Sequence, residues 1–132
     1  MSVRFMLDTD IVSYALRGQG RAAGAIAQHP SSELCISAIT MAQLCYGADR
    51  RRSSKVRAAI DEFARKIDIV PFNESCARHY GAISGDLERR GIPIGEFDVL
   101  IAAHALSINA TLVTNNVKHF SRVHGLRVEN WF

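Results

Sequence analysis

Short, mostly apolar runs alternate along the chain with longer segments of helical periodicity. Apolar runs bounded by turn residues are typical of buried strands, whereas apolar residues spaced three or four positions apart are typical of amphipathic helices. The pattern predicts strands over residues 3–7, 33–37, 69–72, 111–114 and 127–129. It predicts helices over residues 11–17, 21–28, 40–52, 54–66 and 97–108, and a long helix that Asn73 caps and Gly91 ends.

Strands that alternate with helices predict an α/β fold. We expect a three-layer α/β/α sandwich with a mostly parallel central sheet. The sequence contains no linker, internal repeat or low-complexity segment, so one domain spanning residues 1–132 is expected. A chain of this length can bury a sufficient core without disulfide or metal cross-links.

Composition and charge add a mild indication. Hydrophobic residues make up 48% and charged residues 22%, an ordinary globular balance, and the formal net charge is +3. Basic residues are concentrated in one stretch, which is either a solvated helical face or a surface for nucleic acid. They are Arg50, Arg51, Arg52, Lys55, Arg57, Arg65 and Lys66.

The cysteines and the apolar segments bear on location. Three cysteines, Cys35, Cys45 and Cys76, form no CxxC pair, so we expect buried free thiols in a reducing cytoplasm. The apolar stretch before Asp8 is too short for a signal peptide, and no apolar segment has the length of a membrane span. Tyr46 and the other tyrosines are expected to pack against the core.

Acidic and amide side chains fall where the predicted strands end. Asp8 follows the first strand, and Thr114 and Asn116 follow the fourth. Asp98 lies at the start of the helix before the fourth strand, where the helix dipole favours an anion. Because sites in parallel sheets lie beyond the carboxyl ends of the strands, these groups are expected to share one pocket.

Such oxygen donors suit Mg²⁺, or Mn²⁺ in its place. Mg²⁺ binds one or two carboxylates and keeps several water molecules, so Asp8 and Asp98 are the predicted metal ligands. From the residues alone, helix capping explains Asp98 equally well. Capping also explains the Asp8-Thr9-Asp10 turn, with Asp10 as the expected cap of the first helix.

Five motifs in order resemble those of PIN domains in the VapC toxins of bacterial toxin–antitoxin pairs. They lie at residues 5–11, 36–48, 94–105, 112–120 and 125–131, and they span essentially the whole chain. Each motif alone is weak, but the ordered set at this spacing is specific to the family.

The resemblance implies a toxin that cuts RNA, in many members a tRNA, with Mg²⁺ or Mn²⁺ held by acids. It also implies a VapB-type antitoxin partner whose tail occupies a groove, and a homodimer within a larger assembly. The helices between residues 10 and 28 are the expected walls of that groove. By the resemblance, the catalytic residues are Asp8, Gln43, Asp98 and Asn116.

Two positions depart from the family pattern. Gln43 stands where a glutamate is usual, by natural variation or by an introduced change, and His119 stands where an acid is usual. An amide carries no charge, so we expect weaker Mg²⁺ binding, with Asp10 and Glu96 as nearby acids that could compensate.

Two other functions fit parts of the sequence. Asp8-Thr9-Asp10-Ile11-Val12 matches the opening of haloacid-dehalogenase-type phosphatases, in which the first Asp is a nucleophile and the second an acid or base. The later motifs of that class are missing. Alternatively, the loss of two acids is compatible with a PIN domain that binds RNA or antitoxin without cutting.

Overall fold

The computed structural model describes residues 4–132, and its centre is a five-stranded sheet. The strand order is β3-β2-β1-β4-β5, and all four neighbouring pairs are parallel. The strands are β1 (Phe5–Leu7), β2 (Leu34–Ser37), β3 (Asp68–Val70), β4 (Thr111–Val113) and β5 (Val128–Glu129). Position 3 of the predicted first strand lies outside the described residues.

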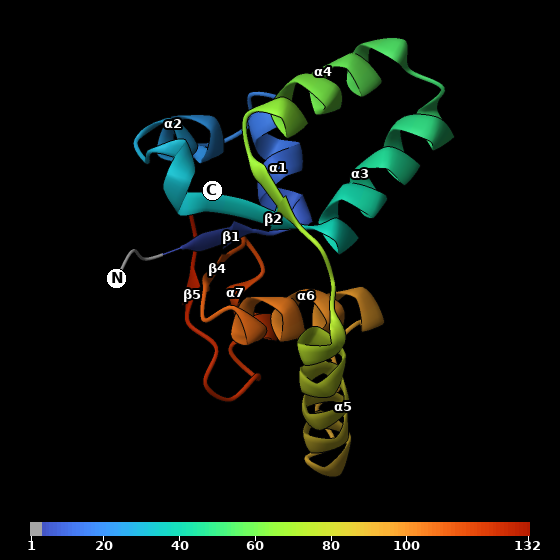
Figure 1. Cartoon of the computed structure of the whole chain (residues 1–132), viewed down its shortest axis with the longest axis vertical. Helices are drawn as coiled ribbons and strands as arrows, with labels where there is room; N and C mark the ends of the chain where they lie inside the picture. The colour runs from blue at the N-terminus through green and yellow to red at the C-terminus, as the bar shows by residue number, and fades with distance from the viewer. Residues whose placement is uncertain (1–3) are drawn as a thin grey trace.

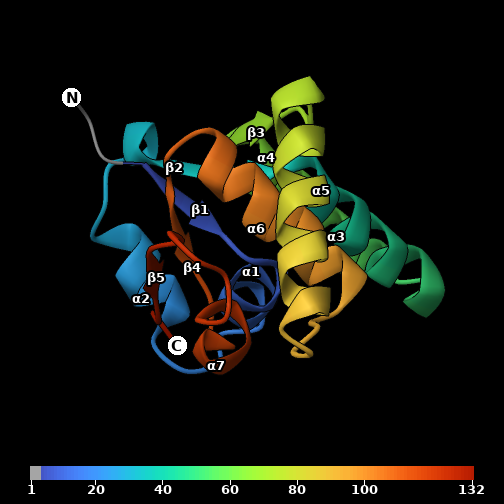
Figure 2. The same cartoon turned by 90° about the horizontal axis from the view of Figure 1, so that it is seen from below.

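Helices cover both faces of the sheet (Figures 1 and 2). One face carries α1 (Thr9–Leu16), α2 (Ala22–Ala27), α3 (Ala38–Arg51) and α4 (Ser54–Arg65). The other carries α5 (Glu74–Arg89), α6 (Glu96–Ser107) and the short α7 (Val117–Phe120). The predicted three-layer α/β/α sandwich is confirmed, and every strand pair in it is parallel.

Alternate residues of each strand supply the two halves of the core. In β1, Met6 packs with the helices α5 and α6, whereas Leu7 packs with α1 and α3. Leu112 and Val113 divide in the same way in β4. Because both faces are covered, the central strands are apolar at consecutive positions rather than alternating with polar residues.

Side-chain caps fix where four of the helices begin, α1, α3, α4 and α5. Asn73 caps α5 as predicted, its Oδ1 accepting from the Cys76 N–H at 3.1 Å. The cap of α1 is Asp8, not Asp10, because the helix begins one residue after the strand and the first carboxylate therefore meets its free N–H groups. Ser37 caps α3 and also contacts the buried His104.

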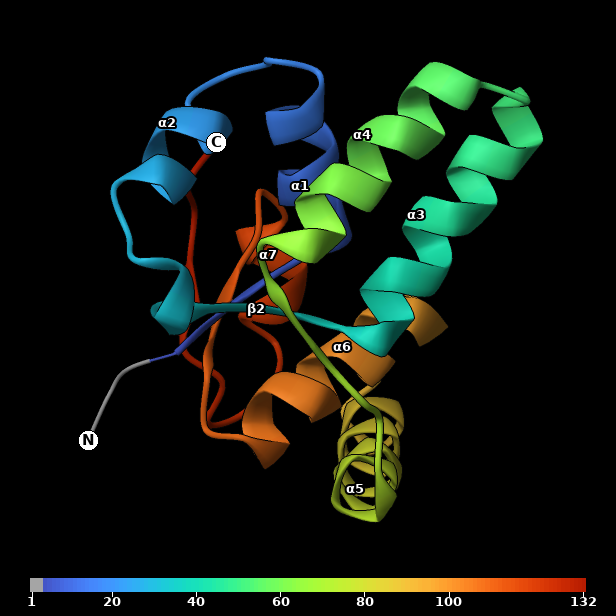
Figure 3. The same cartoon turned by 45° about the horizontal axis from the view of Figure 1, so that its top comes forward.

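The α3–α4 hairpin extends away from the sheet (Figures 1 and 3), which overturns two predictions. Cys45 and Tyr46 are exposed rather than buried, Tyr46 by 67%. The buried stripe of α3 consists of Thr40, Leu44 and Ala48, and Cys45 and Tyr46 lie on the exposed side of the helix.

Two short elements were not predicted, a single 3₁₀ turn at Ser31–Glu33 and α7. Each contains too few residues for a periodic pattern to appear in the sequence. Among residues 4–132, no helix is both long enough and apolar enough to cross a membrane.

Truncation in the central sheet should be costly. Leu112 is fully buried, so Leu112→Ala should lower the free energy of unfolding by about 2–5 kcal/mol, measured by urea denaturation. Tyr46→Ala is the control, because that side chain is exposed and should change stability by under about 0.5 kcal/mol. Equal losses for the two variants would contradict this assignment of the core.

Candidate functional site

Asp8 lies directly after β1, the central strand, at the carboxyl edge of the sheet. It is 6% exposed. Its Oδ1 accepts from the Thr9 backbone N–H at 2.8 Å, and its Oδ2 accepts from the Thr114 hydroxyl at 2.8 Å. Its own N–H donates to the Val113 carbonyl at 2.8 Å, which ties the end of β1 to the end of β4. The carboxylate is thus held in one orientation by both strands.

A second carboxylate, that of Asp10, approaches the same hydroxyl. Its oxygens lie 3.4 and 3.5 Å from Thr114 Oγ1, and Oδ2 accepts from the Asn115 N–H at 3.1 Å. Thr114 Oγ1 also accepts from the Asn116 N–H at 3.0 Å. The turn after β4 therefore brings the two aspartates of the β1–α1 junction together.

Asp98 is the third residue of α6, and Gly95 occupies the cap position of that helix. Asp98 makes no capping hydrogen bond, so capping does not account for it. Its Oδ2 lies 3.7 Å from His119 Nδ1. Asn116 Nδ2 lies 2.9 Å from the same ring nitrogen, so the side chain of Asn116 contacts His119 rather than Asp8.

The three aspartates resist ionisation in the absence of a cation. Burial, and then the charge of Asp10, raises the pKa of Asp8 from 3.8 to about 7, with a smaller contribution from Asp98. Burial also raises the pKa of Asp10 and of Asp98. A cation bound beside these carboxylates would therefore strongly stabilise their ionised form.

The donor set at this edge is rich in oxygen. Among residues 4–132, no three His, Cys, Asp or Glu side chains are gathered closely enough to enclose an ion. The carboxylates of Asp8 and Asp10 around the Thr114 hydroxyl fit a hard cation that uses one or two carboxylates and keeps its water molecules. Glu96, the other acid expected nearby, is exposed and borders a different hollow beside Tyr80.

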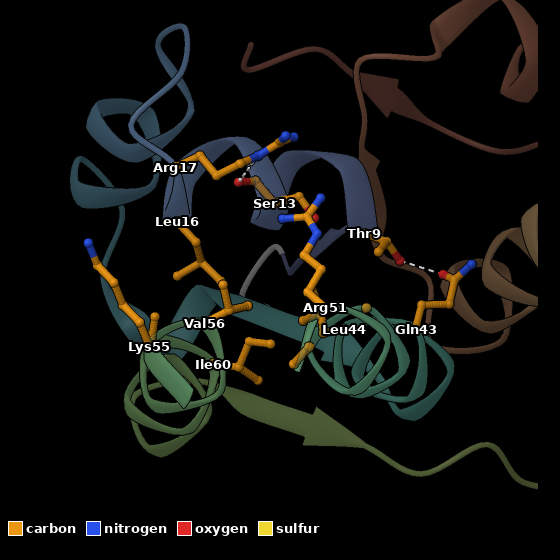
Figure 4. Close-up of a pocket in the computed structure, with 13 residues that line it drawn as sticks. Thr9, Ser13, Leu16, Arg17, Gln43, Leu44, Arg51, Lys55, Val56 and Ile60 are labelled. Atoms are coloured by element: carbon orange, nitrogen blue, oxygen red, sulfur yellow. Dashed lines mark hydrogen bonds between the residues drawn. The ribbon is translucent and has the colours of Figure 1, made fainter. Parts of the chain in front are cut away.

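Gln43 lies on α3 and reaches the start of α1. Its Oε1 accepts from the Thr9 hydroxyl at 2.5 Å (Figure 4). The same hydroxyl lies 3.2 Å from Thr40 Oγ1. The side chain of Gln43 therefore contacts Thr9, the residue that follows Asp8 in the sequence.

A groove of about 490 Å³ runs from this point between α1, α3 and α4 (Figure 4). Thr9 and Gln43 lie at one end, and apolar side chains line it, among them Leu16, Leu44, Val56 and Ile60. Arg17, Arg51 and Lys55 add positive charge along its border. Of the helices expected to form a groove, only α1 lines this one, because α3 and α4 supply the remaining walls.

Sequence reasoning missed three contacts of the site. They are the hydroxyl of Thr9 on Gln43, the Asn115 N–H on Asp10, and the approach of His119 to Asp98. The first two join residues that lie 34 and 105 positions apart in the sequence, so only the folded chain brings them together. The third depends on α7, a helix of four residues that is too short to give a periodic pattern in the sequence.

Comparisons with known proteins agree with this architecture. Residues 5–126 match the PIN domain family. The tRNA(fMet)-specific endonuclease VapC of Shigella flexneri is 36% identical, over 98% of this chain and 98% of that protein. Ribonuclease VapC2 of Rickettsia felis is also 36% identical, over 96% and 97%.

Solved structures of similar proteins superpose closely. A chain from VapBC2 of Rickettsia felis bound to a promoter DNA fragment has a TM-score of 0.89 at 34% identity, covering 98% of this chain and 100% of that one. DNA-bound VapBC from Salmonella typhimurium gives 0.90 at 32% identity, covering 98% and 99%.

The chain therefore belongs to the PIN-domain family and, within it, to the VapC ribonucleases. This confirms the resemblance seen in the sequence motifs. The matches support neither the phosphatase alternative nor a PIN domain that binds without cutting.

Ionisation of Asp8 should destabilise the metal-free protein as pH rises. Its pKa is about 7 in the folded chain, against the ordinary value of 3.8, so the folded state binds the proton more tightly. The stability that this group contributes is complete below the lower value and is lost as pH rises through the higher one. Unfolding free energy measured in EDTA should fall across that interval.

Asp8→Asn keeps one acceptor oxygen, for the Thr9 N–H, and turns an amide N–H toward Thr114 Oγ1. Because it cannot ionise, it should remove most of the fall in stability with pH. Asp61→Asn removes an exposed carboxylate from α4 and should leave the pH profile as in the wild type. An unchanged profile for Asp8→Asn would show that Asp8 ionises at its ordinary pKa.

Proposed function

We propose that this chain is the toxin of a type II toxin–antitoxin pair, a metal-dependent endoribonuclease that a VapB-type antitoxin inhibits. Residues 1–132 act as one PIN domain. The observation that carries the proposal is the convergence of Asp8 and Asp10 on Thr114 at the carboxyl edge of the sheet, with Asp98 near enough to raise the pKa of Asp8, in a VapC-type chain.

Asp8 and Asp98 are the proposed ligands of Mg²⁺, with Mn²⁺ as the alternative ion. When bound, such a cation polarises a phosphodiester oxygen, lowers the pKa of a bound water and neutralises charge on the leaving oxygen. The raised pKa values of both residues support this role, since a positive neighbour stabilises such carboxylates in their ionised form.

Neighbouring side chains hold the carboxylates in place for this role. Thr114 and the Thr9 N–H fix the two oxygens of Asp8. Gln43 adds a carbonyl oxygen at the groove end of the site through its contact with Thr9. Asn116 acts from the other side by orienting His119 against Asp98. Their proposed catalytic role is positioning rather than direct metal binding.

The substrate is proposed to be RNA in the bacterial cytoplasm. Two similar proteins, of Shigella flexneri and Salmonella typhimurium, are named as tRNA(fMet)-specific endonucleases, so tRNA(fMet) is the first RNA to test. The exposed cations between Arg50 and Arg57 are proposed to contact the phosphates of the RNA.

The proposed assembly of the toxin is a homodimer.

The groove between α1, α3 and α4 is the proposed antitoxin site. Its apolar lining fits the nonpolar face of a peptide segment, and the cations at its border fit acidic residues of that segment. Because one end of the groove reaches Thr9 and Gln43, an occupant would lie against the catalytic edge.

Loss of either proposed ligand should abolish cleavage. Asp98→Asn and Asp8→Asn should each lower Mg²⁺-dependent cleavage of tRNA(fMet) by at least about a hundredfold, since too few charged oxygens remain to hold the cation. Gel-resolved cleavage at equal folded concentration is the measurement. Asp61→Asn serves as the control for removal of a carboxylate, and full activity in a folded Asp98→Ala variant would exclude Asp98 as a ligand.

Restoring an acid at position 43 should strengthen the site. Gln43→Glu retains an acceptor for Thr9 and adds a negative charge beside the metal ligands. Mg²⁺ affinity and cleavage rate should rise about ten- to hundredfold, the effect of about 1.4–3 kcal/mol. Mg²⁺-titrated cleavage of one RNA compares the two proteins, and a variant no faster at any Mg²⁺ concentration would show that position 43 is not a lost ligand.

Filling the groove should prevent inhibition without unfolding the protein. Gly47 lines the groove, and a Cβ added there meets no atom within 4 Å. Gly47→Phe should therefore weaken binding of the cognate VapB-type antitoxin by at least about tenfold, as measured by calorimetry. Gly81→Phe is matched, because Gly81 is equally open but lies on α5. Equal binding by both variants would place the antitoxin elsewhere.

A further inference from the structure

His119 occupies a fixed place at the edge of the proposed metal site. It belongs to α7, whose last residue, Phe120, is fully buried in the core beside the sheet. This anchor holds the neighbouring imidazole against α6, where His119 Nδ1 lies 3.7 Å from Asp98 Oδ2. The side chain is 42% exposed, so one side of the ring is open to solvent.

The contact with Asn116 fixes which ring nitrogen of His119 lies beside Asp98. Asn116 Nδ2 lies 2.9 Å from His119 Nδ1, and an amide nitrogen can only donate a hydrogen bond. In the tautomer that carries the ring proton on Nε2, Nδ1 presents its lone pair beside the Asp98 carboxylate. A nitrogen lone pair and a carboxylate oxygen then face the same small region.

These two atoms have nearly the separation of neighbouring ligands on one cation. Octahedral ligands at the usual metal–ligand distance lie about 3 Å from one another, which a small side-chain rotation reaches from 3.7 Å. Imidazole is a good ligand for first-row transition metals, whereas Mg²⁺ prefers oxygen. The family's usual acid at this position would favour Mg²⁺, and a histidine changes that preference.

We propose, building on the proposed function, that His119 Nδ1 and Asp98 bind one cation together and make the site selective for Mn²⁺ over Mg²⁺. Because the site offers few protein ligands, one nitrogen ligand has a large effect on the preference between Mn²⁺ and Mg²⁺. Gln43 strengthens it further, because an uncharged amide at that position removes attraction that Mg²⁺ needs more than Mn²⁺ does.

The first test measures metal binding to the metal-free protein without RNA. Free Mn²⁺ is followed by its EPR signal, and Mg²⁺ is measured by competition. His119→Ala should weaken Mn²⁺ binding by at least about tenfold and change Mg²⁺ binding by less than about twofold. His119→Glu should reverse the preference in favour of Mg²⁺. His79→Ala, which removes a histidine of α5, should bind both ions as the wild type does.

The second test asks whether nitrogen touches the metal. Pulsed EPR of the Mn²⁺-loaded protein should show a ¹⁴N coupling that His119→Ala removes. A bound Mn²⁺ that depends on Asp8 and Asp98 but shows no nitrogen coupling would overturn this inference and leave the proposed nuclease site intact. No binding of either ion by the wild type would overturn both.

Discussion

The structure depends most on one unfavourable burial, that of the Asp8 carboxylate at the end of the central strand. Two hydrogen bonds orient it, yet they do not offset its loss of hydration, and Asp10 adds repulsion. A group of this kind is costly unless a positive charge accompanies it. The PIN-domain fold also places Asp98, on a helix from the opposite face of the sheet, close enough that its charge raises the pKa of Asp8.

The all-parallel sheet makes this convergence possible. β1 and β4 are neighbours, so Asp8 and Thr114 meet although 106 positions separate them in sequence. The α/β connections then bring α3 to the same edge from one face and α6 and α7 from the other. The groove on the α3 side and the imidazole on the α7 side are therefore two approaches to one set of carboxylates, and the family assignment gives that set its nuclease role.

Much of this was visible in the sequence. Apolar runs located all five strands, and the order of elements predicted the parallel sheet, because both signals are local. The position of Asp8 after a buried strand predicted its place at the edge. The cap of α1 was misassigned, since Asp8 and Asp10 have equal capping propensity and only the strand end distinguishes them. The pairing of His119 with Asp98 could not be predicted, because it requires a four-residue helix docked through Phe120.

The central claim is that the carboxylate of Asp8 binds a cation. Carbon-detected NMR titration of its side-chain carboxyl group, with and without Mg²⁺, measures this directly. In the metal-free protein the group should titrate with a pKa of about 7, and saturating Mg²⁺ should lower that pKa markedly. Titration near the ordinary value of 3.8, or a pKa that neither Mg²⁺ nor Mn²⁺ changes, would contradict the account.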